Sequence, residues 1–185
     1  MAGSLIKVDE FTISSPVASV ILGGGSSGSS GLNASIDSTY DVYMVEMSNV
    51  EIATASKYIA MRVTESGTAN TTTNYDAAYK NLRADTTFNN SNYQNLSYFY
   101  TINNVMGNTA NQTLNGIKYI FNANNSSEYT FFTNEISAYS NPATLWGNTG
   151  GEVFTSTSSV DGVQFFLYDT GNIDNGTFTL YGLKK

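Results

Sequence analysis

The fold class is decided by the final stretch of the sequence, Asn175-Gly176-Thr177-Phe178-Thr179-Leu180-Tyr181-Gly182-Leu183-Lys184-Lys185. Asn-Gly is the preferred pair for a two-residue hairpin turn, because both central residues of that turn need positive φ. After this pair, Thr177, Thr179 and Tyr181 alternate with Phe178 and Leu180, which is the period of a half-buried strand. We therefore expect a tight turn followed by a last strand that is built into a β-sheet.

Similar strand signals recur upstream, separated by turns rich in Asn, Ser, Gly and Thr. Ile59, Met61 and Val63, for example, alternate with residues of the opposite face. The expected strands are 5–13, 17–22, 41–50, 58–64, 98–102, 116–122, 128–137, 152–156, 162–169 and 177–183. Such spacing predicts an all-β protein, an antiparallel β-sandwich of about nine or ten strands, with a jelly roll as the preferred topology.

The whole chain, 1–185, is expected to be a single domain that contains two irregular stretches. The first is a Gly/Ser-rich loop at 23–35, which we expect to be flexible. It lacks the Lys of a phosphate-binding loop, and no helix pattern follows it.

The second irregular stretch is a long polar excursion at 65–95. Tyr75, Ala78, Tyr79 and Leu82 fall there at i, i+3, i+4 and i+7, the spacing of one short amphipathic helix. The alternative is that these side chains pin a long loop onto the sandwich.

The composition limits the function classes. The net charge is −7 and the eight Lys and Arg are scattered, which argues against binding nucleic acid by counterion release. The absence of Cys and His removes disulfides, thiolate metal sites and the usual general base. No apolar run approaches the roughly 20 residues that cross a bilayer, and no secretory signal pattern opens the chain. We expect no enzyme, no cofactor and no membrane insertion.

One candidate metal site lies between the last two expected strands. Asp169, Asn172 and Asp174 place three short oxygen-bearing side chains within six positions, and calcium prefers such oxygen ligands. The stretch lacks the ordered alternation and the terminal Glu of an EF-hand. Because a hairpin loop uses the same residue types for its geometry, a plain turn is the main alternative.

One candidate glycan contact surrounds the single Trp. Trp146 lies between Asn141 and Asn148, and an exposed ring beside amide side chains would suit stacking on a sugar. A lone Trp in a sandwich also serves to cover the core or an interface, so both interpretations stay open. The acidic residues, in contrast, show no spacing that predicts a catalytic carboxylate pair.

Several stretches resemble small structural proteins of tailed phages, notably phages of cyanobacteria and marine bacteria. They include the final GTFTLYGLK segment, Ser4-Leu5-Ile6-Lys7, Tyr40-Asp41-Val42-Tyr43, Gly67-Thr68-Ala69-Asn70, Asn74-Tyr75-Asp76-Ala77-Ala78-Tyr79, Asn124-Asn125-Ser126-Ser127-Glu128-Tyr129 and Gly162-Val163-Gln164-Phe165-Phe166. The resemblance extends loosely over almost the whole chain. It implies a β-sandwich virion component and carries over no catalytic residue.

Within that resemblance, a capsid decoration or cement protein is the first expectation. The alternatives are a tail-fibre or receptor-binding module, or a free carbohydrate-binding domain of lectin type. The expected partners are phage coat or tail proteins, a host-surface glycan in the alternatives, and further copies of the chain itself. Self-association is expected because the 13 Tyr and 10 Phe belong to the residue types that concentrate at interfaces. Trimers are common among viral jelly rolls, and the expected location is the virion, assembled in the host cytoplasm.

Overall fold

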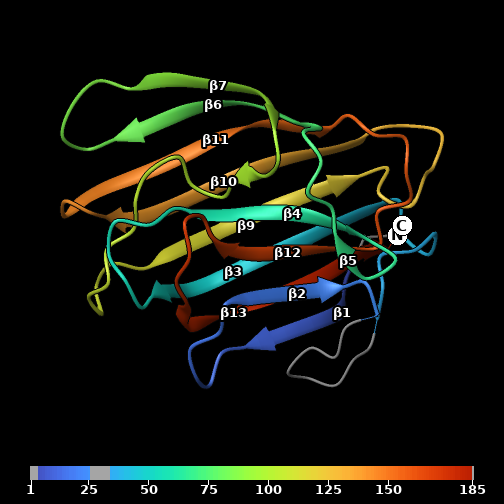
Figure 1. Ribbon diagram of the computed structural model, residues 1–185, viewed down its shortest axis with the longest axis horizontal. Coiled ribbons are helices and arrows are strands. Elements are labelled where there is room, and N and C mark those ends of the chain that lie inside the picture. The colour runs from blue at the N-terminus through green and yellow to red at the C-terminus, as the bar shows by residue number, and fades with distance from the viewer. Residues whose placement is uncertain (1–3, 26–33, 185) are drawn as a thin grey trace.

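The computed structural model describes residues 4–25 and 34–184, which form thirteen β-strands and no helix (Figure 1). The strands are β1 (Ser4–Thr12), β2 (Ser19–Gly23), β3 (Val42–Ile52), β4 (Ile59–Glu65), β5 (Thr68–Ala69), β6 (Tyr75–Arg83), β7 (Asn89–Leu96), β8 (Phe99–Tyr100), β9 (Leu114–Phe121), β10 (Thr130–Ser140), β11 (Thr144–Phe154), β12 (Gly162–Leu167) and β13 (Ile173–Lys184). The described residues therefore contain no helix that could span a membrane.

The strands form two antiparallel sheets. The large sheet has the order β1-β13-β3-β9-β10-β11-β6-β7, and the small sheet has the order β2-β12-β4-β5, with the short β8 also paired to β4. The predicted antiparallel β-sandwich is confirmed. The preferred topology, a jelly roll, has eight strands in two Greek keys. The strands observed here divide into sheets of eight and five, so they do not have the strand arrangement of a jelly roll.

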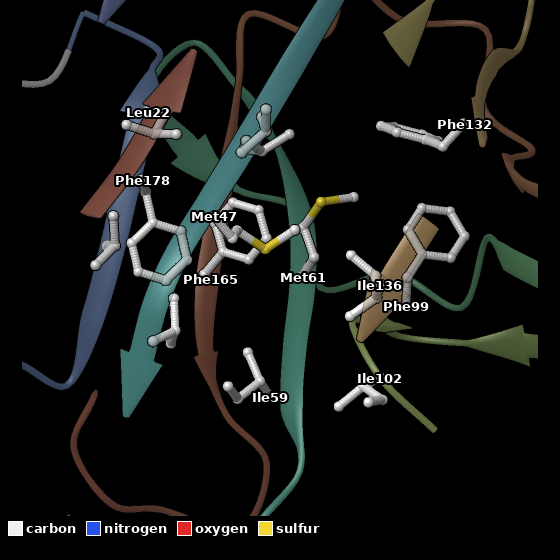
Figure 2. Close-up of a cluster of buried hydrophobic side chains, with 14 of the residues drawn as sticks. Leu22, Met47, Ile59, Met61, Phe99, Ile102, Phe132, Ile136, Phe165 and Phe178 are labelled. Atoms are coloured by element: carbon white, nitrogen blue, oxygen red, sulfur yellow. The ribbon is translucent and has the colours of Figure 1, made fainter. Parts of the chain in front are cut away.

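The apolar core lies where the small sheet covers the large one (Figure 2). Phe165 of β12 and Phe178 of β13 meet across the two layers with ring centroids 4.9 Å apart. Met47 and Met61 fill the space beside them, and all four side chains are almost completely buried. Burial of each such side chain contributes about 1.5–3 kcal/mol, so this cluster is a main source of stability.

The large sheet extends beyond the small one. Its inner face at β6, β10 and β11 is covered instead by β8 and by the segment that follows it, residues 101–113. The Nδ2 of Asn104 donates to the Oγ of Ser140, and the Nε2 of Gln112 donates to the carbonyl oxygen of the same residue. Ile102 and Met106 of this segment are completely buried, so it acts as a third piece of the inner layer.

The predicted helix in the 65–95 stretch is wrong, because this stretch forms β5, β6 and β7. Tyr75 and Tyr79 fit a helical spacing, but they also fit the two-residue period of a strand. In β6 the buried residues are Tyr75, Ala77, Tyr79 and Asn81, and the residues between them face away from the small sheet. Pairing with β11 on one side and β7 on the other selects the extended form.

The predicted hairpin turn at Asn175-Gly176 is also wrong, although the strand that follows it is confirmed. Both residues lie inside β13, where the pairing with β3 shifts register on either side of Asn175. Gly176 has φ of 121°, and a Cβ there would lie 2.8 Å from the Cα of Val50. The Gly therefore permits a bulge within a long strand instead of a turn between two strands.

The Gly/Ser loop is described only in part. Gly23, Gly24 and Gly25 all have positive φ, which matches their residue type. The loop predicted to be flexible spans residues 23–35. Its central part, residues 26–33, lies outside the described residues.

Candidate functional site

A group of polar side chains lies inside the sandwich, on the inner face of the large sheet. Lys118 of β9 points inward, and its Nζ lies 2.5 and 2.7 Å from the two carboxylate oxygens of Glu152 in β11. Tyr79 donates its hydroxyl to Oε1 of Glu152 at 2.7 Å, and Asn134 donates its Nδ2 to the same oxygen at 3.1 Å. We call these four residues the buried polar cluster.

Burial governs the electrostatics of the buried polar cluster. The Lys118 side chain is completely buried, and this burial lowers its pKa against the opposing attraction of Glu152. Burial also raises the pKa of Tyr79 well above its usual value, and the neighbouring Glu152 carboxylate adds to the shift. Both effects follow from the cost of placing charge in a medium of low dielectric constant.

The buried polar cluster has the groups for acid–base chemistry but no access for a substrate. None of its members has more than 3% of its surface exposed. Its hydrogen bonds link four strands, β6, β9, β10 and β11, so its role is to hold this part of the sheet together. Sequence reasoning missed it, although one signal was present: Lys118 alternates with Ile117 and Tyr119 in a strand and shares its face with Ile120.

A second set of inward polar side chains adjoins the cluster. Asn81 of β6 lies directly opposite Asn148 of β11, and both are 1% exposed. Neither side-chain polar atom of Asn148 has a hydrogen-bond partner within the described protein, nor does Nε1 of Trp146. Buried groups of this kind are rare, which marks this end of the interior as chemically distinct from the apolar core.

The predicted glycan contact at Trp146 does not form. Trp146 and Asn148 point into the sandwich, and only 7% of Trp146 is exposed, so a sugar ring cannot stack on it. The Arg83 guanidinium lies over the indole at 4.5 Å from the ring centre. Asn141 lies apart from this pair, where its Nδ2 donates to the Oγ of Ser56. The Trp therefore covers the core, which was the alternative interpretation.

The candidate calcium residues lie on an exposed turn. Asp169 has φ of 67°, and its carbonyl oxygen accepts a hydrogen bond from Nζ of Lys57. The carbonyl oxygen of Asn172 accepts one from the backbone N–H of Ala53, and Asp174 is exposed at the start of β13. Among the described residues, no three acidic, His or Cys side chains gather as a metal site would require. The turn geometry accounts for the residue types.

An accessible site lies on the opposite face of the large sheet. We call it the outer surface: the solvent-facing side of β6, β7, β10 and β11. The described residues line three adjoining open hollows there, of about 600, 490 and 230 Å³. Two Gly residues of β11 help to form them, since Gly147 and Gly151 present no side chain to the solvent side.

Apolar side chains surround these hollows. Phe131 is 46% exposed at one end of the outer surface, and Leu82, Phe88 and Leu145 gather at the other end around the smallest hollow. Large contiguous apolar patches commonly mark contact sites for other macromolecules, so these two apolar groups are candidate contact points. Sequence reasoning missed this surface, because it depends on strands 75–83 and 89–96, which were not predicted as strands.

Comparisons with known proteins found no match: no protein-family model, no curated protein and no solved structure is similar to this chain.

Proposed function

We propose that this protein is a non-enzymatic structural component of a tailed-phage virion, and that it decorates the capsid as a cement protein. The observation that carries the proposal is the outer surface. It is broad and open, it exposes large apolar side chains, and it lies on an eight-stranded sheet that is rigid through its pairing. A surface of this form suits docking against the flat faces of coat subunits.

Two further observations support the proposal. The sequence resembles small phage structural proteins in segments that fall in several strands, among them the terminal β13 and β12. In addition, Tyr79 and Lys118, whose pKa values are shifted by burial, are enclosed, so the described residues offer them to no substrate. A role through contact therefore fits the molecule better than a role through catalysis.

The proposal is tested by mass spectrometry of purified particles of the phage that encodes the chain, with its copy number measured relative to the major coat protein. Decoration of the capsid predicts copy numbers comparable with those of the coat subunits. A much smaller number would assign the protein to the tail. Absence from washed particles would overturn the virion proposal altogether.

A substitution can connect this result to the outer surface. A Cβ placed on Gly151 meets no atom within 4 Å, so Gly151→Lys fills the largest hollow without straining the fold. Rebinding to particles that lack the protein should then be lost. Thr12→Lys, on an exposed part of the distant β1, serves as a charge-matched control that keeps rebinding.

A second function, as a receptor-binding module or a free lectin-type domain, is favoured by one separate observation. A polar hollow of about 420 Å³ lies at one end of the sandwich and is lined by Asp37, Ser38, Tyr40, Asp41, Asn122, Asn124 and Asn125. Hydroxyl, amide and carboxylate groups beside a Tyr ring are suited to a sugar. Binding of the purified protein to a glycan array, abolished by Tyr40→Ala, would support this function in place of decoration.

A further inference from the structure

The two edges of the large sheet differ in a way that points to self-association. β1 forms one edge and β7 forms the other. An edge strand presents unpaired N–H and C=O groups to its open side, and these are a template for pairing with another chain. Most soluble proteins protect such edges by charges, bulges or inward-pointing ionised residues.

The β1 edge has all three kinds of protection. Lys7 and Glu10 form an exposed ion pair on it, with Nζ and Oε2 3.3 Å apart. A register shift interrupts its pairing with β13 between Lys7 and Asp9. Asp9 points inward and is completely buried, where its carboxylate accepts hydrogen bonds from the N–H groups of Gly23 and Glu10.

The β7 edge has none of these features along its regular part. The strand Asn89–Leu96 contains no charged residue and no Pro. Its pairing with β6 is regular from Asn89 to Tyr93, and the one irregularity lies beyond Tyr93. Among the described residues, no strand pairs with its outer side, and Figure 1 shows β7 along the border of the molecule.

The side chains of β7 are fixed for pairing. On the inner face, Ser91 accepts hydrogen bonds from the Nδ2 groups of Asn81 and Asn103, at 2.8 and 2.7 Å. On the outer face, Oδ1 of Asn90 accepts one from Nζ of Lys80 at 3.2 Å. The strand is thereby held extended in the sheet before any partner arrives, which reduces the entropy lost on association.

We propose that β7 pairs antiparallel with β7 of a second copy of this chain, about a two-fold axis at Ser91, to form a dimer with a continuous large sheet. In this register Asn90 of each copy lies opposite Asn92 of the other copy on the outer face. The two-fold axis therefore creates two equivalent Asn–Asn pairs. Facing amides can hydrogen-bond to each other across strands. A second copy of β7, running antiparallel, is the strand that places Asn side chains opposite both Asn90 and Asn92.

Charge opposes this dimer only weakly. The nearest ionised residue on the outer face is Lys80, one strand inside the edge. The backbones of the two copies of Lys80 lie three strand spacings apart, roughly 14 Å. Each Nζ reaches Asn90 on the edge strand, so the two ammonium groups lie closer together than their backbones. Because salt screens the repulsion between these two exposed ammonium groups, the dimer should be at least as stable at high salt as at low salt. The inference does not rest on the proposed virion function, since it concerns the isolated protein.

The first test is sedimentation velocity of the purified protein over a range of concentrations. The wild type should dimerise, and Asn90→Lys/Asn92→Lys should be monomeric, because the paired strands would then face four lysines. Thr133→Lys/Thr149→Lys adds the same charge to exposed positions of interior strands and should still dimerise. Circular dichroism checks that each variant is folded.

The second test locates the interface. Because the chain has no Cys, Asn92→Cys introduces a single thiol. The two copies of residue 92 are diagonal neighbours, about 7–8 Å apart in this register, so a short bis-maleimide should join them into a covalent dimer. Thr149→Cys is the control, since its two copies lie five strand spacings apart, roughly 24 Å.

The outcomes separate clearly. Dimers that are lost only with the β7 lysines, and cross-linking only through position 92, support the inference. A monomeric wild type, a trimer, or a dimer that tolerates the β7 lysines would overturn it.

Discussion

The two ends of the sandwich interior are built from different chemistry. Under the small sheet, the interior is apolar, and Phe165, Phe178 and Leu22 fill it with almost no exposed surface (Figure 2). Beneath β8 and residues 101–113, the same large sheet presents Lys118 and Glu152 to the interior instead. One sheet can therefore be stabilised by burial of apolar area at one end and by a network of hydrogen bonds at the other.

The difference determines how much stability a substitution removes at each end of the interior. An apolar core loses stability in proportion to the volume that a substitution removes. A buried ion pair is costly to form, but it is far more costly to break, because removal of one partner leaves the other charge buried and unpaired. The two ends should therefore respond differently to substitutions of similar size.

The largest effect is expected for Lys118→Met, which keeps most of the side-chain volume but removes the charge. Glu152 would then be buried with only Tyr79 and Asn134 as partners, and the free energy of unfolding should fall by about 3–5 kcal/mol. Urea denaturation measures this change. Lys118→Met/Glu152→Gln should be more stable than the single variant, since the amide oxygen can still accept from Tyr79 and Asn134. A double variant as unstable as the sum of both single variants would contradict the comparison.

A smaller or equal effect is expected for Leu22→Ala at the apolar end. Leu22 is completely buried between the sheets, and truncation of such a side chain costs about 2–5 kcal/mol through lost burial and the cavity that remains. The exposed Leu145 is the control, because Leu145→Ala should change stability by less than about 0.5 kcal/mol. The same urea experiment applies, and equal losses at the two Leu positions would show that the assigned burial is incorrect.

The smallest effect is expected at Asp9, the buried carboxylate near the apolar end. Burial raises its pKa above the ordinary 3.8, against hydrogen bonds from Gly23 and Glu10 that lower it. The folded state therefore binds this proton more tightly than the unfolded state does, and its contribution to stability falls as pH rises from 3.8 towards neutrality. Asp9→Asn lacks this dependence.

The measurement for Asp9 is the difference in unfolding free energy between wild type and Asp9→Asn across that pH range. The difference should shift in favour of the variant as pH rises. A difference that is constant with pH, or that shifts in favour of the wild type, would show that the pKa of Asp9 is not raised.

The fold class was predictable because most strands show their period directly. Ile59, Met61 and Val63 in β4 and Phe178 and Leu180 in β13 are buried as their alternation requires. The helix prediction failed because the positions of Tyr75 and Tyr79 satisfy both periods, and the choice between them is made by the neighbouring strands β7 and β11. β7 itself was missed because Asn, Ser and Gln dominate it, and these residue types have little intrinsic preference for strands.

The candidate sites were less predictable than the fold. Trp146 was a reasonable candidate for an exposed ring, but strand direction decides which face a side chain occupies, and position 146 falls on the inner face of β11. A one-residue change in the boundary of a strand reverses every such assignment. The contact between Lys118 and Glu152 joins residues 34 positions apart in sequence through the register of three strands, which no local pattern encodes.

The pairing of Ser4 with Lys184 places both described ends of the chain at one corner of the large sheet (Figure 1). Two unrelated peptides joined at Ser4 and at Lys184 would therefore start on neighbouring strands and would act as neighbours. The corner at which these two strands pair is thus a natural place for displaying split tags or paired epitopes.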